Sequence, residues 1–134
     1  MAGDKKSNKG TVLIVEDEPA LSDIYATKLV AEGYDVIAAL DGVEGFNKAV
    51  NHLPSIILLD IVLPIKNGFD VLRDLKLNPK TADIPVIILS NLGQSYEIKR
   101  GFNLGAIAFL TKANLLPSQV VNEVNKALSG AHQE

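Results

Sequence analysis

The sequence of 134 residues contains no cysteine, which excludes disulfides, thiolate metal sites and cysteine nucleophiles and is consistent with a reducing cytosol. It also contains no apolar run near the ~20 residues that a membrane-spanning helix needs. Lys5, Lys6 and Lys9 near the start have no apolar run close behind them, so we expect neither a signal peptide nor a membrane anchor. The net charge of -3 is too small to indicate nucleic acid or a membrane surface as a partner. We therefore expect a cytoplasmic protein.

Apolar residues are present in the amount that a folded domain needs. The chain is 47% hydrophobic and 22% charged, which is typical of globular proteins and not of disordered ones. A chain of this length forms one domain and buries roughly two-thirds of its unfolded surface. The first ten residues are polar and contain glycine. We expect residues 1–10 to form a disordered leader, residues 11–129 the domain, and residues 130–134 a short tail.

Short apolar runs alternate along the chain with segments whose apolar residues recur at helical spacing. The runs are 11–15, 34–39, 55–60, 84–90 and 107–111. Runs without polar alternation are typical of strands buried on both faces of a parallel sheet, whereas the more alternating run 34–39 is typical of a strand nearer an edge. In the weakest helical segment, 94–104, Ile98 and Phe102 are the apolar positions. Parallel strands need crossover connections, so the alternation predicts a single α/β domain with helices on both faces of a parallel sheet.

Polar side chains stand at the carboxyl ends of four predicted strands. Glu16 and Asp17 follow the first strand, Asp60 ends the third, Ser90 ends the fourth, and Lys112 follows the fifth. The carboxyl ends of parallel strands share one edge of the sheet, where open α/β sheets bind ligands. Carboxylates that converge there raise one another's pKa, and a divalent cation relieves their repulsion. Mg²⁺ suits such a site because it binds carboxylates, keeps several waters and works with phosphate.

The same set of side chains contains the parts of phosphoryl transfer onto aspartate: a carboxylate nucleophile, a metal site, an ammonium group and a hydroxyl group. Each residue alone also has an ordinary explanation. Asp60 could start a turn before Pro64, Glu16 could complement a helix dipole, and Lys112 and Ser90 could be surface residues. Their predicted convergence at one edge of the sheet favours the functional explanation.

These residues lie in motifs that resemble the response-regulator receiver domain of two-component signalling. The motifs are LIVEDEP at 13–19, LLDIVLP at 58–64, NG at 67–68, ILS at 88–90, and GA with FLTK within 105–112. The resemblance runs from about Val12 to Leu128. It implies a flavodoxin-like (βα)5 doubly wound sheet with strand order 2-1-3-4-5. It also implies a signalling protein that catalyses only its own phosphorylation and dephosphorylation, and not an enzyme of metabolism.

The resemblance further implies the roles of the acidic residues. Asp60 would accept a phosphoryl group from a phosphohistidine of a sensor histidine kinase or of a histidine phosphotransfer domain. Asp17 and Asp60 would bind Mg²⁺, with Glu16 binding it directly or through a water. The backbone carbonyl of Val62, two residues past the acceptor, would be the remaining protein ligand of the metal.

The remaining implied roles concern switching. Ser90 and Lys112 would hold the phosphoryl oxygens, and Phe109 would rotate inward when Ser90 moves toward the phosphate. The surface of the fourth helix, fifth strand and fifth helix would then bind a downstream protein or a second copy of the chain. No direct contact with nucleic acid or membrane is expected.

Three positions depart from the commonest form of the family. Glu16 is longer than the aspartate often found at the first acidic position. Asn91 follows Ser90 where many members have a small residue, and Ala113 follows the lysine where many have proline. Asn91 and Ala113, together with Val62, predict a drier and more crowded pocket.

The residues two positions past Asp60 and Ser90 bear on dephosphorylation. They are Val62 and Leu92, which are apolar and cannot orient an attacking water. We therefore predict slow self-dephosphorylation.

Three other classes of protein share part of this pattern. A haloacid-dehalogenase-type phosphatase also uses an aspartate and Mg²⁺, but it needs an acid two residues after the nucleophile, where Val62 stands. A flavodoxin needs a Ser/Thr-rich loop after the first strand, and here that loop is acidic. A non-phosphorylated docking module is disfavoured by the complete set of site residues.

Overall fold

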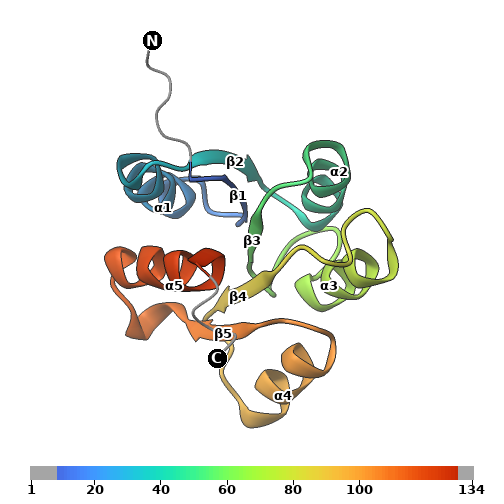
Figure 1. Cartoon of the computed structure of the whole chain (residues 1–134). Coiled ribbons are helices and arrows are strands. Elements are labelled where there is room, and N and C mark those ends of the chain that lie inside the picture. The colour runs from blue at the N-terminus through green and yellow to red at the C-terminus, as the bar shows by residue number, and fades with distance from the viewer. Residues whose placement is uncertain (1–8, 130–134) are drawn as a thin grey trace.

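The structure is a computed structural model that describes residues 9–129 (Figure 1). Residues 1–8, which are most of the predicted leader, and residues 130–134, the predicted tail, lie outside the described residues. In chain order the elements are β1 (Thr11–Val15), α1 (Pro19–Glu32), β2 (Asp35–Ala39), α2 (Gly42–His52), β3 (Ile56–Leu59), α3 (Gly68–Leu77), β4 (Val86–Ser90), α4 (Ser95–Asn103), β5 (Ala108–Thr111), the 3-10 turn η2 (Lys112–Asn114) and α5 (Pro117–Ser129). No helix within 9–129 is long and apolar enough to cross a membrane.

The strands form one parallel sheet in the order β2-β1-β3-β4-β5. Helices α1 and α5 lie side by side on one face of the sheet, and α2 and α3 lie on the other (Figure 1). The doubly wound α/β fold and its strand order, predicted from the sequence, are confirmed. The run 34–39, whose alternation is typical of a strand near an edge, forms the edge strand β2.

The central strands are buried on both faces, as their unbroken apolar runs predict. In β1, Leu13 and Val15 belong to the core cluster beneath α2 and α3, while Val12 and Ile14 belong to the cluster beneath α1 and α5. All of β3 and β4 is buried as well. Burial on both sides stabilises these strands, so the polar residues at their carboxyl ends are attached to a rigid part of the backbone.

Local signals set the ends of the helices. Pro19 opens α1, and Gly33 closes it with a left-handed φ of 114°, donating its N–H to the Leu29 and Val30 carbonyls. At the start of α2, Asp41 Oδ1 accepts the Glu44 N–H at 2.7 Å and so caps the helix.

Helix α4 differs from the sequence prediction. Its buried residue is Gly101, whereas Phe102, expected to face inward, is 47% exposed. The reason is close packing: a Cβ at Gly101 would lie 2.7 Å from Ile88 Cδ1 and 3.1 Å from Phe109 Cδ2. The helix therefore approaches the sheet through a glycine, and the phenylalanine beside it turns outward.

Candidate functional site

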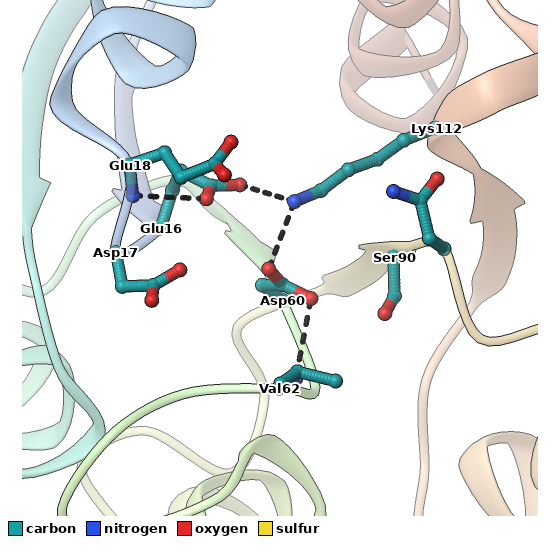
Figure 2. A pocket seen from close by; sticks show the side chains of 8 residues that line it. Glu16, Asp17, Glu18, Asp60, Val62, Ser90 and Lys112 are labelled. Carbon is teal, nitrogen blue, oxygen red and sulfur yellow. Dashed lines mark hydrogen bonds and ion pairs between the residues drawn. The ribbon is translucent and has the colours of Figure 1, made fainter.

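A cleft of about 320 Å³ opens at the carboxyl edge of the sheet. Its lining includes all the residues predicted from the strand ends, which are Glu16, Asp17, Asp60, Ser90 and Lys112. Val62 and Asn91, which the sequence also placed at the pocket, line it as well, and Glu18 is the one addition. These side chains come from the loops after β1, β3, β4 and β5 (Figure 2). The structure thus brings the predicted acids, hydroxyl group and ammonium group into one cleft.

Lys112 reaches across this cleft to two carboxylates (Figure 2). Its Nζ lies 2.6 Å from Glu16 Oε1 and 2.8 Å from Asp60 Oδ2. Both acids are buried, with exposed fractions of 3% and 6%. Buried acids of this kind need a counter-charge, and the Lys112 ammonium supplies it.

Burial and pairing act against each other on the pKa values of this ion pair. Burial raises the pKa of Glu16, although hydrogen bonds from Lys112 and from the Glu18 N–H, the latter at 3.1 Å, oppose the rise. Burial by itself lowers the pKa of Lys112, but its hydrogen bonds to Asp60 and Glu16 outweigh burial and raise it. Lys112 therefore stays a cation at neutral pH.

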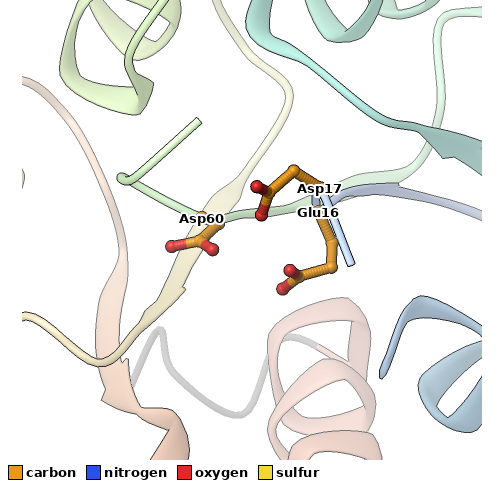
Figure 3. A group of neighbouring side chains, drawn as sticks. All are labelled: Glu16, Asp17 and Asp60. Atoms are coloured by element: carbon orange, nitrogen blue, oxygen red, sulfur yellow. The ribbon is translucent and has the colours of Figure 1, made fainter. Parts of the chain in front are cut away.

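The three predicted metal ligands with carboxylates lie together. Oxygens of Glu16, Asp17 and Asp60 are all within 4.8 Å of one another (Figure 3). Asp17 is exposed, whereas the other two are buried. An all-oxygen group that is open on one side to water fits a Mg²⁺ ion, which keeps part of its hydration shell.

The position of Asp60 depends on a glycine whose contribution sequence reasoning missed. The Asp60 N–H continues the strand ladder by donating to Val15 O at 3.0 Å. At the first residue of α3, a Cβ on Gly68 would lie 2.2 Å from the Asp60 carbonyl oxygen and 2.6 Å from Ile61 Cα. Only glycine lets α3 begin this close to the acceptor loop. The NG pair at 67–68, one of the motifs of the resemblance, is the sequence signal of this contact, although the motif alone does not show what the glycine touches.

Ser90 lies in the cleft without touching Asp60. Its side chain is fully buried, and its hydroxyl oxygen accepts the Leu92 N–H at 3.3 Å. In Figure 2 no interaction joins it to Asp60 or Lys112.

Three residues named from the sequence, Phe109, Leu92 and Ala113, lie outside the cleft lining. Phe109 is half-buried and packs on the core beneath α2 and α3, next to Gly101. Leu92 packs against the same core. Of the two apolar residues predicted to impede a water, Val62 alone lines the cleft, and it is 59% exposed.

A parallel sheet of order 2-1-3-4-5 with acids, a serine and a lysine at its carboxyl edge defines a receiver-type signalling domain. The sequence model of the response regulator receiver domain matches residues 12–125, and the chain belongs to this family. It is thus a receiver domain of two-component signalling.

Individual relatives agree with this assignment. The chain is 45% identical over 101 residues to the DNA-binding dual master transcriptional regulator RpaA of Synechocystis sp., an alignment that covers 75% of this chain and 42% of that one. The chain therefore spans less than half the length of this curated relative. A crystal structure of a response regulator from Chloroflexus aurantiacus superposes with a TM-score of 0.82 at 28% identity, covering 90% of this chain and 98% of that one.

A further solved structure bears on the acidic cluster. A chain of the CheX–CheY–BeF3–Mg²⁺ complex from Borrelia burgdorferi superposes with a TM-score of 0.80 at 30% identity, covering 87% of each chain. Receiver domains bind Mg²⁺ at their acidic pocket, and the cluster of Glu16, Asp17 and Asp60 fits that role.

Proposed function

We propose that Asp60 accepts a phosphoryl group from the phosphohistidine of a histidine kinase or a histidine phosphotransfer domain. An Asp60 carboxylate oxygen attacks the phosphorus, the P–O bond forms, the P–N bond breaks, and its electron pair returns to the imidazole. The observation that carries this proposal is the Lys112 ammonium 2.8 Å from the buried Asp60 carboxylate, beside a cluster of acids. Such preorganised charge stabilises a transferring phosphoryl group.

The chain's own residues prepare this transfer. Asp17 and Asp60, with Glu16 and the Val62 carbonyl, would hold Mg²⁺. The ion, when bound, neutralises charge on the phosphoryl oxygens. Asp60 Oδ1 accepts the Val62 N–H at 3.3 Å, which orients the carboxylate toward the cleft.

Phosphorylation would change the partners of Lys112 and Ser90. A phosphoryl oxygen would attract the Lys112 ammonium away from the Glu16 and Asp60 carboxylates. The Ser90 hydroxyl, whose oxygen accepts the Leu92 N–H, would donate its own hydrogen to a phosphoryl oxygen, and Phe109 would follow inward. These movements would alter the surface of α4, β5 and α5, where we place a downstream protein or a second copy of the chain.

The test is chemical phosphorylation followed by intact mass measurement. With Mg²⁺ and acetyl phosphate, we expect the chain to gain the mass of one phosphoryl group, and Asp60→Asn to gain none. Asp83→Asn is a matched control, because Asp83 is exposed in the loop before β4, at the opposite edge of the sheet. EDTA should prevent the reaction. A natural chain that stays unmodified, or an Asp60→Asn variant that is still modified, would contradict the proposal and favour a docking module.

Oligomeric state tests the proposed output separately. We propose that the phosphorylated domain, residues 11–129 of a cytoplasmic protein, pairs with a downstream partner or with itself. Sedimentation with Mg²⁺ and beryllofluoride, a phosphoryl mimic, should reveal a dimer if the second copy is the partner. A chain that sediments as a monomer both with and without Mg²⁺ and beryllofluoride would count against the dimer and leave a different protein as the target.

A further inference from the structure

One side chain joins the two loops that carry Ser90 and Lys112. Asn91 Oδ1 accepts the backbone N–H of Ala113 at 3.1 Å. We propose that Asn91 is a positioning residue, which holds the turn after β5 so that the Lys112 ammonium stays over Asp60. This inference rests on the proposed phosphoacceptor function, because it concerns how the acceptor site keeps its cation in place.

The turn that bears Lys112 lies between the end of the β4–β5 ladder and Leu115, which packs on the core beneath α1 and α5. The β4–β5 ladder ends with the pair Ser90 and Thr111, one residue before Lys112. No residue of η2 is buried, and just past its end the Leu115 N–H reaches the Lys112 carbonyl at 3.3 Å. The Asn91 side chain therefore extends the connection between the two loops past the end of the ladder, to the residue that follows Lys112.

The donor of this bond exists because residue 113 is not proline. The Ala113 nitrogen carries a hydrogen, and a proline there would carry none. The 3.1 Å separation is within the normal range for an N–H···O bond. The two sequence departures at Asn91 and Ala113 thus become one feature, in which one residue supplies the acceptor and the other the donor.

The bond matters for phosphoryl transfer because the Lys112 ammonium stands at the end of a long, flexible side chain. Its Nζ must lie near the phosphoryl oxygens when Asp60 attacks, and a lysine whose backbone is held loses less freedom in reaching them. Asn91 touches the backbone next to Lys112 and not the reacting atoms. Any effect of this hydrogen bond on phosphorylation must therefore pass through Lys112, whereas an effect of Asn91 on access to the cleft, which it also lines, would not.

The first test is made without phosphorylation, by NMR of the natural chain and two variants. Asn91→Ala should speed amide exchange at Ala113 and move the Lys112 Cε signal toward that of a surface lysine. Asn114→Ala is the matched control, since Asn114 is an exposed asparagine of the same turn. It should leave the Lys112 signal unchanged. An Ala113 amide or a Lys112 signal that is the same in the natural chain and in Asn91→Ala would overturn the inference.

The second test measures phosphorylation by acetyl phosphate with Mg²⁺. Asn91→Ala should slow the reaction about three- to tenfold, as the loss of one net hydrogen bond allows. In a Lys112→Ala background the same substitution should slow it no further. A merely structural role would slow both backgrounds equally, and that result would overturn the inference. If the natural chain is not phosphorylated at all, the proposed function fails, whereas the NMR comparison still decides whether Asn91 positions Lys112.

Discussion

Lys112 Nζ lies 2.6 Å from the Glu16 carboxylate, at a depth where Glu16 is only 3% exposed. The shorter aspartate common at this family position has one methylene less with which to reach the ammonium. Glu16 therefore gives Lys112 a second partner besides Asp60. In the absence of a divalent ion, Lys112 is the cation that balances the acidic cluster.

Lys112→Met tests this balance. Removing one partner of a buried ion pair costs about 3–5 kcal/mol, so we expect a loss of that order in the free energy of unfolding in EDTA. Mg²⁺ should recover part of the loss, because the ion supplies the missing positive charge, and it should stabilise the variant more than the natural chain. Urea unfolding with EDTA and with Mg²⁺ measures both quantities.

A surface lysine provides the comparison for this variant. Lys126 pairs with Glu123 and has a 63% exposed side chain, so Lys126→Met should change the free energy of unfolding by less than about 1 kcal/mol, with or without Mg²⁺. Equal stabilisation of the natural chain and Lys112→Met by Mg²⁺ would show that Lys112 does not balance the cluster.

Much of the fold was predictable because buried strands leave a clear signal. The runs that became β3 and β4 have no polar residue before their ends, and their burial follows from that. The inward face of α4 was not predictable in the same way. Gly101 carries no apolar signal, so periodicity placed Phe102 inside, and only packing against Ile88 and Phe109 shows otherwise.

For the site, the sequence placed the right residues at one edge but not their contacts. The convergence of Glu16 and Asp60 followed from parallel strands, since their β-strands pair directly. The ion pair with Lys112 depends on side-chain lengths across three loops. The bond from Ala113 to Asn91 depends on a backbone donor, which is the same for every residue except proline. Such contacts can be identified only in the three-dimensional structure.

Val62→Asn tests whether the apolar residue at the cleft mouth protects the phosphoryl group. Val62 lines the cleft and is 59% exposed, so an attacking water passes it. An amide there can orient that water, and we expect the phosphoryl half-life to fall severalfold. Val62→Leu, which keeps the site apolar, should keep the half-life. Intact mass spectra at intervals after removal of the donor give both values, and an equal half-life in the asparagine variant would refute the protection.

Gly101→Ala tests the close approach of α4 to the sheet. A new methyl group would lie 2.7 Å from Ile88 Cδ1, and overpacking of this kind costs about 1–3 kcal/mol. The better helix propensity of alanine returns up to ~1 kcal/mol, so a net loss in the free energy of unfolding is expected. Urea unfolding at one temperature measures it.

A second substitution separates crowding from other effects. Ile88→Val removes the Cδ1 atom, and alone it should lower the free energy of unfolding by ~0.5–1.5 kcal/mol. In the Gly101→Ala background the same substitution should lower it by less, or raise it, because the crowding is relieved. Gly93→Ala is the control, since a Cβ there meets Thr111 Oγ1 at an ordinary 3.5 Å. Strict additivity of the Gly101 and Ile88 changes would mean that the two side chains do not compete for space.

Lys76 predicts a pH dependence away from the site. Its Nζ donates hydrogen bonds to the carbonyls of Ala82 at 3.1 Å and Ile84 at 2.7 Å, and burial lowers its pKa from the ordinary 10.5. Between the lowered pKa and the ordinary one, the unfolded chain holds a proton that the folded chain has released. The free energy of unfolding therefore rises with pH in that window.

Lys76→Met removes this contribution. We expect the variant to be less stable near neutral pH by about 1–3 kcal/mol, because two carbonyls lose their donor. The stability of the natural chain relative to the variant should then grow as the pH approaches 10.5. Lys80→Met, at an exposed lysine in the connection between α3 and β4, should show no such growth. Urea unfolding at several alkaline pH values measures these free energies. If the free energy of unfolding changes with pH equally in the natural chain and in Lys76→Met, burial does not destabilise the Lys76 ammonium.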